Sequence, residues 1–88
     1  MAPTVKVNLL FFAKAKELTG QTSVELDFAS ELTLRDFIDK VILHYPSLRV
    51  LKDNLIIALN QNYVNNLNEI LLLNEKDEIA LIPPISGG

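Results

Sequence analysis

The sequence lacks the residue types on which several kinds of site depend. It has no cysteine and no tryptophan, and its single histidine is His44. The absence of cysteine excludes disulfides, a thiolate nucleophile and cysteine-ligated metals. One histidine without a cysteine offers no partner for a metal site or a catalytic pair. We therefore expect the domain to bind no metal, and we expect His44 to have a structural or solvent-exposed role.

The chain also lacks an excess of positive charge and long apolar runs. Eight basic and eleven acidic residues give a net charge of -3, which makes nucleic acid a poor candidate partner. No apolar run approaches the roughly 18 residues of a membrane span, and no signal-peptide pattern is present. The expectation is a cytoplasmic protein with no membrane partner. With 88 residues, 49% of them hydrophobic, the chain is long enough for one small domain with its own core.

The first part of the chain predicts two strands joined by a short helix. Apolar residues alternate over residues 5–11 and again over 24–28, which is typical of half-buried strands. Residues 13–18 predict one or two helical turns, for which Gly20 is a suitable C-terminal stop. Because the connection is short, we expect the two strands to be antiparallel neighbours.

The clearest helix begins at Thr33. Thr33 can cap it, with Asp36 three residues later, and Pro46 ends it. Lys40 is assigned to the polar face, where a substitution should have little effect on docking. The apolar stripe recurs at helical spacing through Leu34, Phe37, Ile38, Val41, Ile42 and Tyr45.

Short strands are expected in the second half of the chain. Residues 55–59 predict a central strand, a turn at 60–62 leads to a return strand at 63–64, and residues 78–82 form the last strand. Residues 69–73 remain ambiguous. The element order predicts an α+β fold of the β-grasp, or ubiquitin-like, type, with a mixed sheet of about five strands packed against one main helix.

A second set of apolar residues alternates with the predicted core. If the odd-numbered residues of the first strand face the helix, Leu10 and Phe12 face away, together with Ile82 and Tyr63. One helix covers only one face of a sheet, so these residues predict an exposed partner-binding patch. The alternative is that residues 71–73 fold over and cover it.

The chain ends in a Pro-Pro pair followed by a Gly-Gly tip. Pro83 and Pro84 prevent the last strand from continuing, whereas Gly87 and Gly88 could enter a channel too narrow for side chains. We divide the chain into a domain at 1–84 and a flexible tail at 85–88. The tail spans at most about 14 Å when extended. The alternative is an ordinary frayed terminus.

Two other groups of polar residues suggest chemistry only weakly. Ser86 has no base nearby in the sequence, so we interpret it as a spacer in the tail. The acidic residues Glu75, Asp77 and Glu78 could form a carboxylate pair, but such a pair needs a pocket. A tight surface turn is the preferred interpretation of this cluster.

Three segments give the chain a family resemblance. They are LFFAKAKELTG at residues 10–20, ALNQNYV at 58–64 and DEIALIPPISGG at 77–88. With these segments the chain resembles the small, sulfur-carrying subunits of molybdopterin synthase over nearly its whole length. Two positions depart from the family's usual residues, namely Lys16, where arginine is common, and Ile82, where some members have an aromatic residue.

The resemblance implies a carrier that is not itself an enzyme. An E1-like adenylating and sulfurating enzyme would use ATP to join the Gly88 carboxylate to AMP, and a sulfur donor would convert it to a thiocarboxylate. The large synthase subunit would then use this sulfur to convert cyclic pyranopterin monophosphate to molybdopterin. The resemblance further implies a heterotetramer of two small and two large subunits. It gives Gly87 a role in fitting the tail, and it assigns partner binding to Phe12, Tyr63, Ile82, Pro83, Pro84, Ile85 and Ser86.

Other functions remain open at this stage. Carriers of the same fold serve thiamine synthesis and tRNA thiolation. A ubiquitin-like modifier would use the same adenylation but would join Gly88 to a lysine. A plain interaction domain would leave the tail without a chemical role. The domain itself is expected to bind neither a cofactor nor a nucleotide, because it has no glycine-rich phosphate loop.

Overall fold

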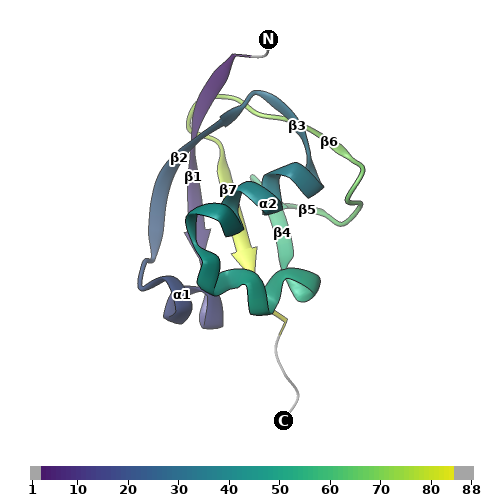
Figure 1. Cartoon of the computed structure of the whole chain (residues 1–88). Coiled ribbons are helices and arrows are strands. Elements are labelled where there is room, and N and C mark those ends of the chain that lie inside the picture. Colours follow the sequence, from purple (N-terminus) through teal and green to yellow (C-terminus); the bar gives the residue numbers. More distant parts are fainter. Residues whose placement is uncertain (1–2, 85–88) are drawn as a thin grey trace.

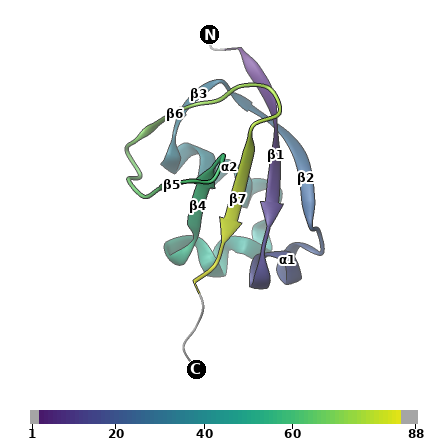
Figure 2. The ribbon, with the colours of Figure 1, turned by 180° about the vertical axis from the view of Figure 1, so that it is seen from behind.

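The computed structural model describes residues 3–84 and is built around a mixed sheet. Five strands lie in the order β2–β1–β7–β4–β5 (Figures 1 and 2). Strands β1 and β7 are parallel, and the other neighbours are antiparallel. The strands are β1 (Thr4–Phe11), β2 (Ser23–Ala29), β4 (Ile56–Leu59), β5 (Asn62–Val64) and β7 (Glu78–Ile82). The predicted α+β fold with its five-stranded sheet is confirmed, and β4 is an interior strand between β7 and β5.

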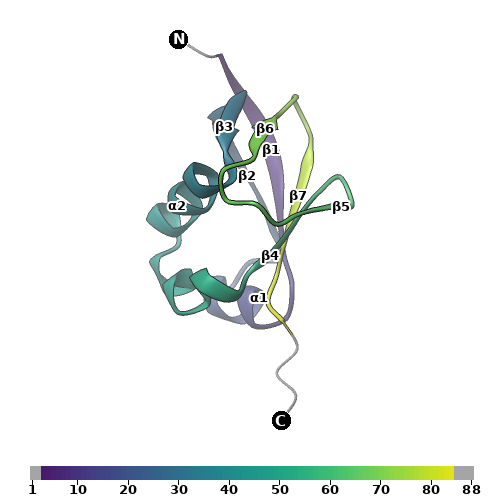
Figure 3. The same cartoon turned by 90° about the vertical axis from the view of Figure 1, so that its right-hand side faces the viewer.

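The main helix, α2 (Leu34–His44), lies across one face of the sheet, as the edge-on view shows (Figure 3). The Thr33 hydroxyl accepts a hydrogen bond of 3.1 Å from the Asp36 N–H, so the predicted cap is confirmed. The shorter helix α1 (Ala13–Thr19) ends at Gly20, whose φ of 70° lies in the left-handed region. The Gly20 N–H donates to the Lys16 carbonyl, which closes the last turn.

Three elements of the structure were not predicted from the sequence. After α2 the chain continues as a 3₁₀-helix, η1 (Pro46–Asn54). A second, two-stranded sheet pairs β3 (Glu31–Thr33) with β6 (Ile70–Leu72). Each of these strands has only three residues, which is too short for an alternation to be recognised. Their pairing also joins segments that lie far apart in the sequence.

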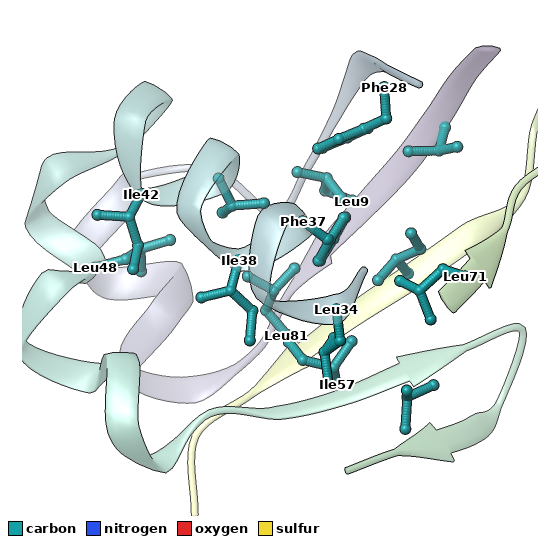
Figure 4. Packing of buried hydrophobic residues seen from close by; sticks show 14 of the residues in the cluster. Leu9, Phe28, Leu34, Phe37, Ile38, Ile42, Leu48, Ile57, Leu71 and Leu81 are labelled. Atoms are coloured by element: carbon teal, nitrogen blue, oxygen red, sulfur yellow. The ribbon is translucent and has the colours of Figure 1, made fainter. Parts of the chain in front are cut away.

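The core lies between α2 and the sheet (Figure 4). Leu9, Phe37 and Leu81 are almost fully buried in it. Strand β6 contributes Leu71 to the same cluster, and Leu73 follows. The alternative that residues 71–73 cover the other face of the sheet is therefore wrong. These residues instead close the end of the core beside β3, which leaves the face opposite α2 without a cover among residues 3–84.

Candidate functional site

The sheet face opposite α2 carries a shallow apolar depression of about 310 Å³, which we call the outer hollow. Figure 2 shows the strands that form this face, with α2 behind them. Two polar residues, Gln61 and Glu78, belong to its lining. The apolar lining consists of Leu10, Phe12, Ala58, Tyr63, Ala80 and Ile82.

The floor of the outer hollow follows from the register of the strands. Leu10 pairs with Ala80, Ala80 pairs with Ala58, and Ala58 pairs with Tyr63. One row of side chains therefore crosses four strands on one face. The two inner positions of this row are alanines and the two outer positions are large. Small residues between large ones leave a depression, so the outer hollow is a direct result of this register.

Phe12 and Ile82 border the outer hollow at the end where β7 finishes. The Phe12 N–H donates to the Leu81 carbonyl at 3.2 Å, which holds the end of β1 against the end of β7. The Phe12 side chain remains 46% exposed, and Tyr63 is 75% exposed. The structure thus brings Phe12, Tyr63 and Ile82 to one face, as the alternation predicts. Their role in binding a partner stays a prediction.

Asn60, which the sequence predicts only as part of a turn, holds the far end of the outer hollow. Asn60 has a φ of 48°, and its side chain donates to the Asp77 carboxylate at 3.1 Å. The same side chain accepts a hydrogen bond from the Glu78 N–H at 2.9 Å. Asn60 therefore fastens the β4–β5 hairpin, which carries Tyr63, to the turn before β7. Asparagine is common in left-handed turns, and this preference was the only signal in the sequence.

The acidic cluster forms a tight turn, in line with the preferred interpretation. The Asp77 carboxylate accepts a hydrogen bond from the Asn74 N–H at 2.8 Å, and the Lys76 N–H donates to the Lys6 carbonyl at 2.7 Å. Glu75 accepts a hydrogen bond from the Lys6 N–H. The Glu75 and Asp77 carboxylates therefore stabilise the connection to β7, and of the three acidic residues only Glu78 lines the outer hollow.

The last strand ends beside the outer hollow. Pro83 is buried and Pro84 is exposed, and the described residues end at this proline pair. The predicted site residues Ile85, Ser86, Gly87 and Gly88 lie outside the described residues. Within residues 3–84, no group of three or more His, Cys, Asp or Glu side chains is placed to hold a metal ion. In the same residues, no helix has the length and apolar character needed to cross a membrane.

Comparisons with known proteins agree with this architecture. The ThiS family model matches residues 9–88. The molybdopterin synthase sulfur carrier subunit of Drosophila yakuba is 42% identical over 86 residues, which cover 98% of this chain and 94% of that protein.

Solved structures show the same fold. SAMP1 from Haloferax volcanii superposes with a TM-score of 0.76 and 25% identity, over 94% of this chain and 99% of that one. Subunits 1 and 2 of the molybdopterin-converting factor of Helicobacter pylori 26695 have been solved as a complex. One chain of that complex matches with a TM-score of 0.65 and 25% identity, over 96% of this chain and all of that one. The chain therefore belongs to the ThiS family, in the group of the molybdopterin synthase sulfur carrier subunits.

Proposed function

We propose that the protein is a sulfur carrier of molybdenum cofactor biosynthesis and acts as the small subunit of molybdopterin synthase. The observation that carries this proposal is the similarity to sulfur carrier subunits over nearly the whole chain, within a family match that extends to Gly88. The position of the outer hollow supports it, because Ile82, the last residue of β7, lines the hollow. We expect the protein to work in the cytoplasm.

The reacting group in this proposal is the carboxylate of Gly88. A carboxylate is a poor electrophile at neutral pH, so an E1-like enzyme first joins it to AMP from ATP and releases pyrophosphate. A sulfur donor then displaces AMP and leaves a thiocarboxylate on Gly88. The large subunit receives the tail and transfers this sulfur to cyclic pyranopterin monophosphate, and Gly88 returns to the carboxylate. Two such transfers supply the two sulfurs of the molybdopterin dithiolene. Catalysis lies in the partners, and the small subunit is a covalent cosubstrate.

The outer hollow gives both partners a place to dock. The activating enzyme and the large subunit both require the tail, so we expect them to compete for one surface around Phe12, Tyr63 and Ile82. Burial of a large apolar side chain contributes roughly 1.5–3 kcal/mol, and aromatic residues often dominate an interface. ATP is expected to bind the activating enzyme and not this domain. Two small and two large subunits would form the complete synthase.

The proposal is tested by the intact mass of the protein and by its reaction with the partners. Protein with an untagged C-terminus is incubated with the activating enzyme, ATP and a sulfur donor, and its mass should rise by one sulfur-for-oxygen exchange. Deletion of Gly88, or addition of one residue after it, should abolish molybdopterin formation while the domain remains folded. Normal molybdopterin formation by either variant would overturn the proposal. Attachment to lysines of other proteins would instead indicate a ubiquitin-like modifier.

Gly87→Ala provides a finer test of the same step. The added Cβ would have to fit where the partner grips the backbone, so we expect impaired adenylation or sulfur transfer with unchanged stability. Full activity with alanine and with larger residues at this position would exclude a narrow channel.

A further inference from the structure

We propose that the exposed edge of β5 accepts an extended segment of the large subunit as an additional strand. The added strand would pair with the backbone of Tyr63 and would place alternate side chains on the two sides of the sheet. This inference rests on the proposed function for the identity of the partner. The edge itself is defined by the strand register and by a second hollow beside β5.

The register leaves the Tyr63 backbone facing outward. The Asn60 N–H donates to the Glu78 carbonyl at 2.7 Å, so even-numbered residues of the β4 segment direct their backbone groups toward β7. The backbone groups of Ala58 therefore bond to β7. Ala58 and Tyr63 lie opposite each other in the β4–β5 pair, but they do not hydrogen-bond to each other. The N–H and C=O of Tyr63 consequently point away from β4.

The same conclusion follows from the hairpin. Its two-residue turn, Asn60 and Gln61, has φ values of 48° and 72° and is closed by the pair of Leu59 and Asn62. A closing pair of this kind exchanges backbone hydrogen bonds. Because hydrogen-bonded and non-hydrogen-bonded pairs alternate along antiparallel strands, the next pair, Ala58 and Tyr63, exchanges none. Among residues 3–84, the Tyr63 backbone makes no hydrogen bond to a turn, a loop or a side chain. An outward N–H and C=O at a sheet edge can pair with another strand, and in β5 Tyr63 supplies both groups.

A second hollow adjoins β5, and we call it the side hollow. It measures about 600 Å³ and opens between α2, η1, the start of β4 and the loop after β5. Its apolar lining includes Leu34, Ile38, Ile57, Val64 and Leu67. The charged residues Arg35, Asp39, Lys52 and Asp53 also line it, and Lys52 forms an ion pair with Asp39. Figure 4 shows Leu34, Ile38 and Ile57 together at this end of the core. The side hollow is therefore suited to an aliphatic side chain.

Tyr63 lines both the outer hollow and the side hollow. Successive side chains of a strand point to opposite faces of a sheet. A strand added along β5 would direct one side chain toward the side hollow and the next toward the outer face beside Tyr63. The outer hollow and the side hollow therefore share Tyr63 at the edge of β5. An extended segment can place side chains in both hollows and hydrogen-bond to the outward N–H and C=O of Tyr63. A helix cannot do so, because its own backbone groups are already paired within the helix.

The first test measures hydrogen exchange of the Tyr63 amide by NMR, in the free protein and in the complex with the large subunit. We expect this amide to exchange freely in the isolated chain and at least tenfold more slowly in the complex. The amides of Glu25 and Asp27 on β2, the opposite edge of the sheet, serve as internal references and should change little. Protection of Tyr63 in the free chain, or no added protection in the complex, would overturn the proposal.

The second test separates the Tyr63 N–H from its side chain. Tyr63→Ala removes the ring and retains the N–H, whereas Tyr63→Pro removes both, and proline is tolerated on an edge where the N–H faces solvent. We expect Tyr63→Pro to bind the large subunit roughly 2- to 10-fold more weakly than Tyr63→Ala, the loss equivalent to one hydrogen bond. Equal affinities of two folded variants would contradict strand addition.

The outcomes for this proposal and for the proposed function are distinct. If the protein forms a Gly88 thiocarboxylate and binds the large subunit while Tyr63 remains unprotected, only the strand addition fails. If no large subunit binds and no thiocarboxylate forms, the proposed function fails. Should Tyr63→Pro not fold, the exchange measurement on the unaltered protein still decides the question.

Discussion

Replacement of Phe12 by aspartate tests the docking role of the outer hollow. A phenylalanine side chain buries about 200 Å² when fully covered. Because 46% of Phe12 is exposed, about 90 Å² remains for a partner to cover. At about 25 cal/mol per Å², this area corresponds to about 2.3 kcal/mol, or about a 50-fold change in Kd. We expect Phe12→Asp to weaken binding to each partner by about 10- to 50-fold.

The substitution should leave the domain folded. Phe12 stands at the N-cap of α1, and its side chain makes no capping hydrogen bond. Aspartate is among the preferred N-cap residues, which contributes about 1 kcal/mol and offsets part of the lost packing of the half-buried ring. Urea unfolding should therefore give a free energy within about 2 kcal/mol of the original protein. A larger loss would make the binding result uninformative, and Ile82→Asp would then provide the measurement.

Val50→Asp is a matched control for this experiment. Val50 is 74% exposed on η1, and the substitution makes the same change from an apolar residue to aspartate away from the outer hollow. Lys40 on the polar face of α2 is less suitable. Its ammonium group donates to the Asp27 carbonyl and lies 4.9 Å from the centre of the Phe28 ring, so Lys40→Glu would also change stability.

The assay is a titration of each variant against the large subunit and against the activating enzyme, for example by calorimetry. Both complexes should weaken with Phe12→Asp, and neither should weaken with Val50→Asp. Full affinity for both partners after Phe12→Asp and after Ile82→Asp would refute the reasoning. In that case the outer hollow would not be a docking surface, and the tail would have to supply nearly all of the recognition.

Two further predictions concern the end of α1 and the β4–β5 hairpin. Gly20→Ala should lower the free energy of unfolding by about 1–2 kcal/mol, because φ is 70° there, although a Cβ would meet no atom within 4 Å. Urea unfolding should show a smaller loss for Gly20→Asn, since asparagine tolerates this conformation better. Asn60→Ala should cost about 1–2 kcal/mol, because it removes the two side-chain hydrogen bonds that join the hairpin to the turn before β7. An unchanged urea midpoint for Asn60→Ala would mean that these bonds contribute nothing.

The elements with strong local signals were determined by the sequence itself. The stripe and cap of α2, the stop at Gly20 and the alternation in β1 and β7 each depend on residues within one element. The same alternation placed Phe12 and Ile82 on the face away from the helix, since side-chain direction in a strand follows position alone. The Pro-Pro and Gly-Gly end and its family resemblance were likewise readable without a structure.

Only the tertiary structure decided how these elements meet. The parallel pairing of β1 with β7 brings Leu10 beside Ala80, 70 positions later, and this contact creates the floor of the outer hollow. The β3–β6 pairing, the bonds of Asn60 to the turn before β7 and the outward Tyr63 backbone depend in the same way on long-range register. Local propensity carries no information about register between distant segments, because register is set by the packing of the whole core. The sequence could therefore predict which residues face outward, whereas their assembly into a hollow beside an open strand edge required the fold.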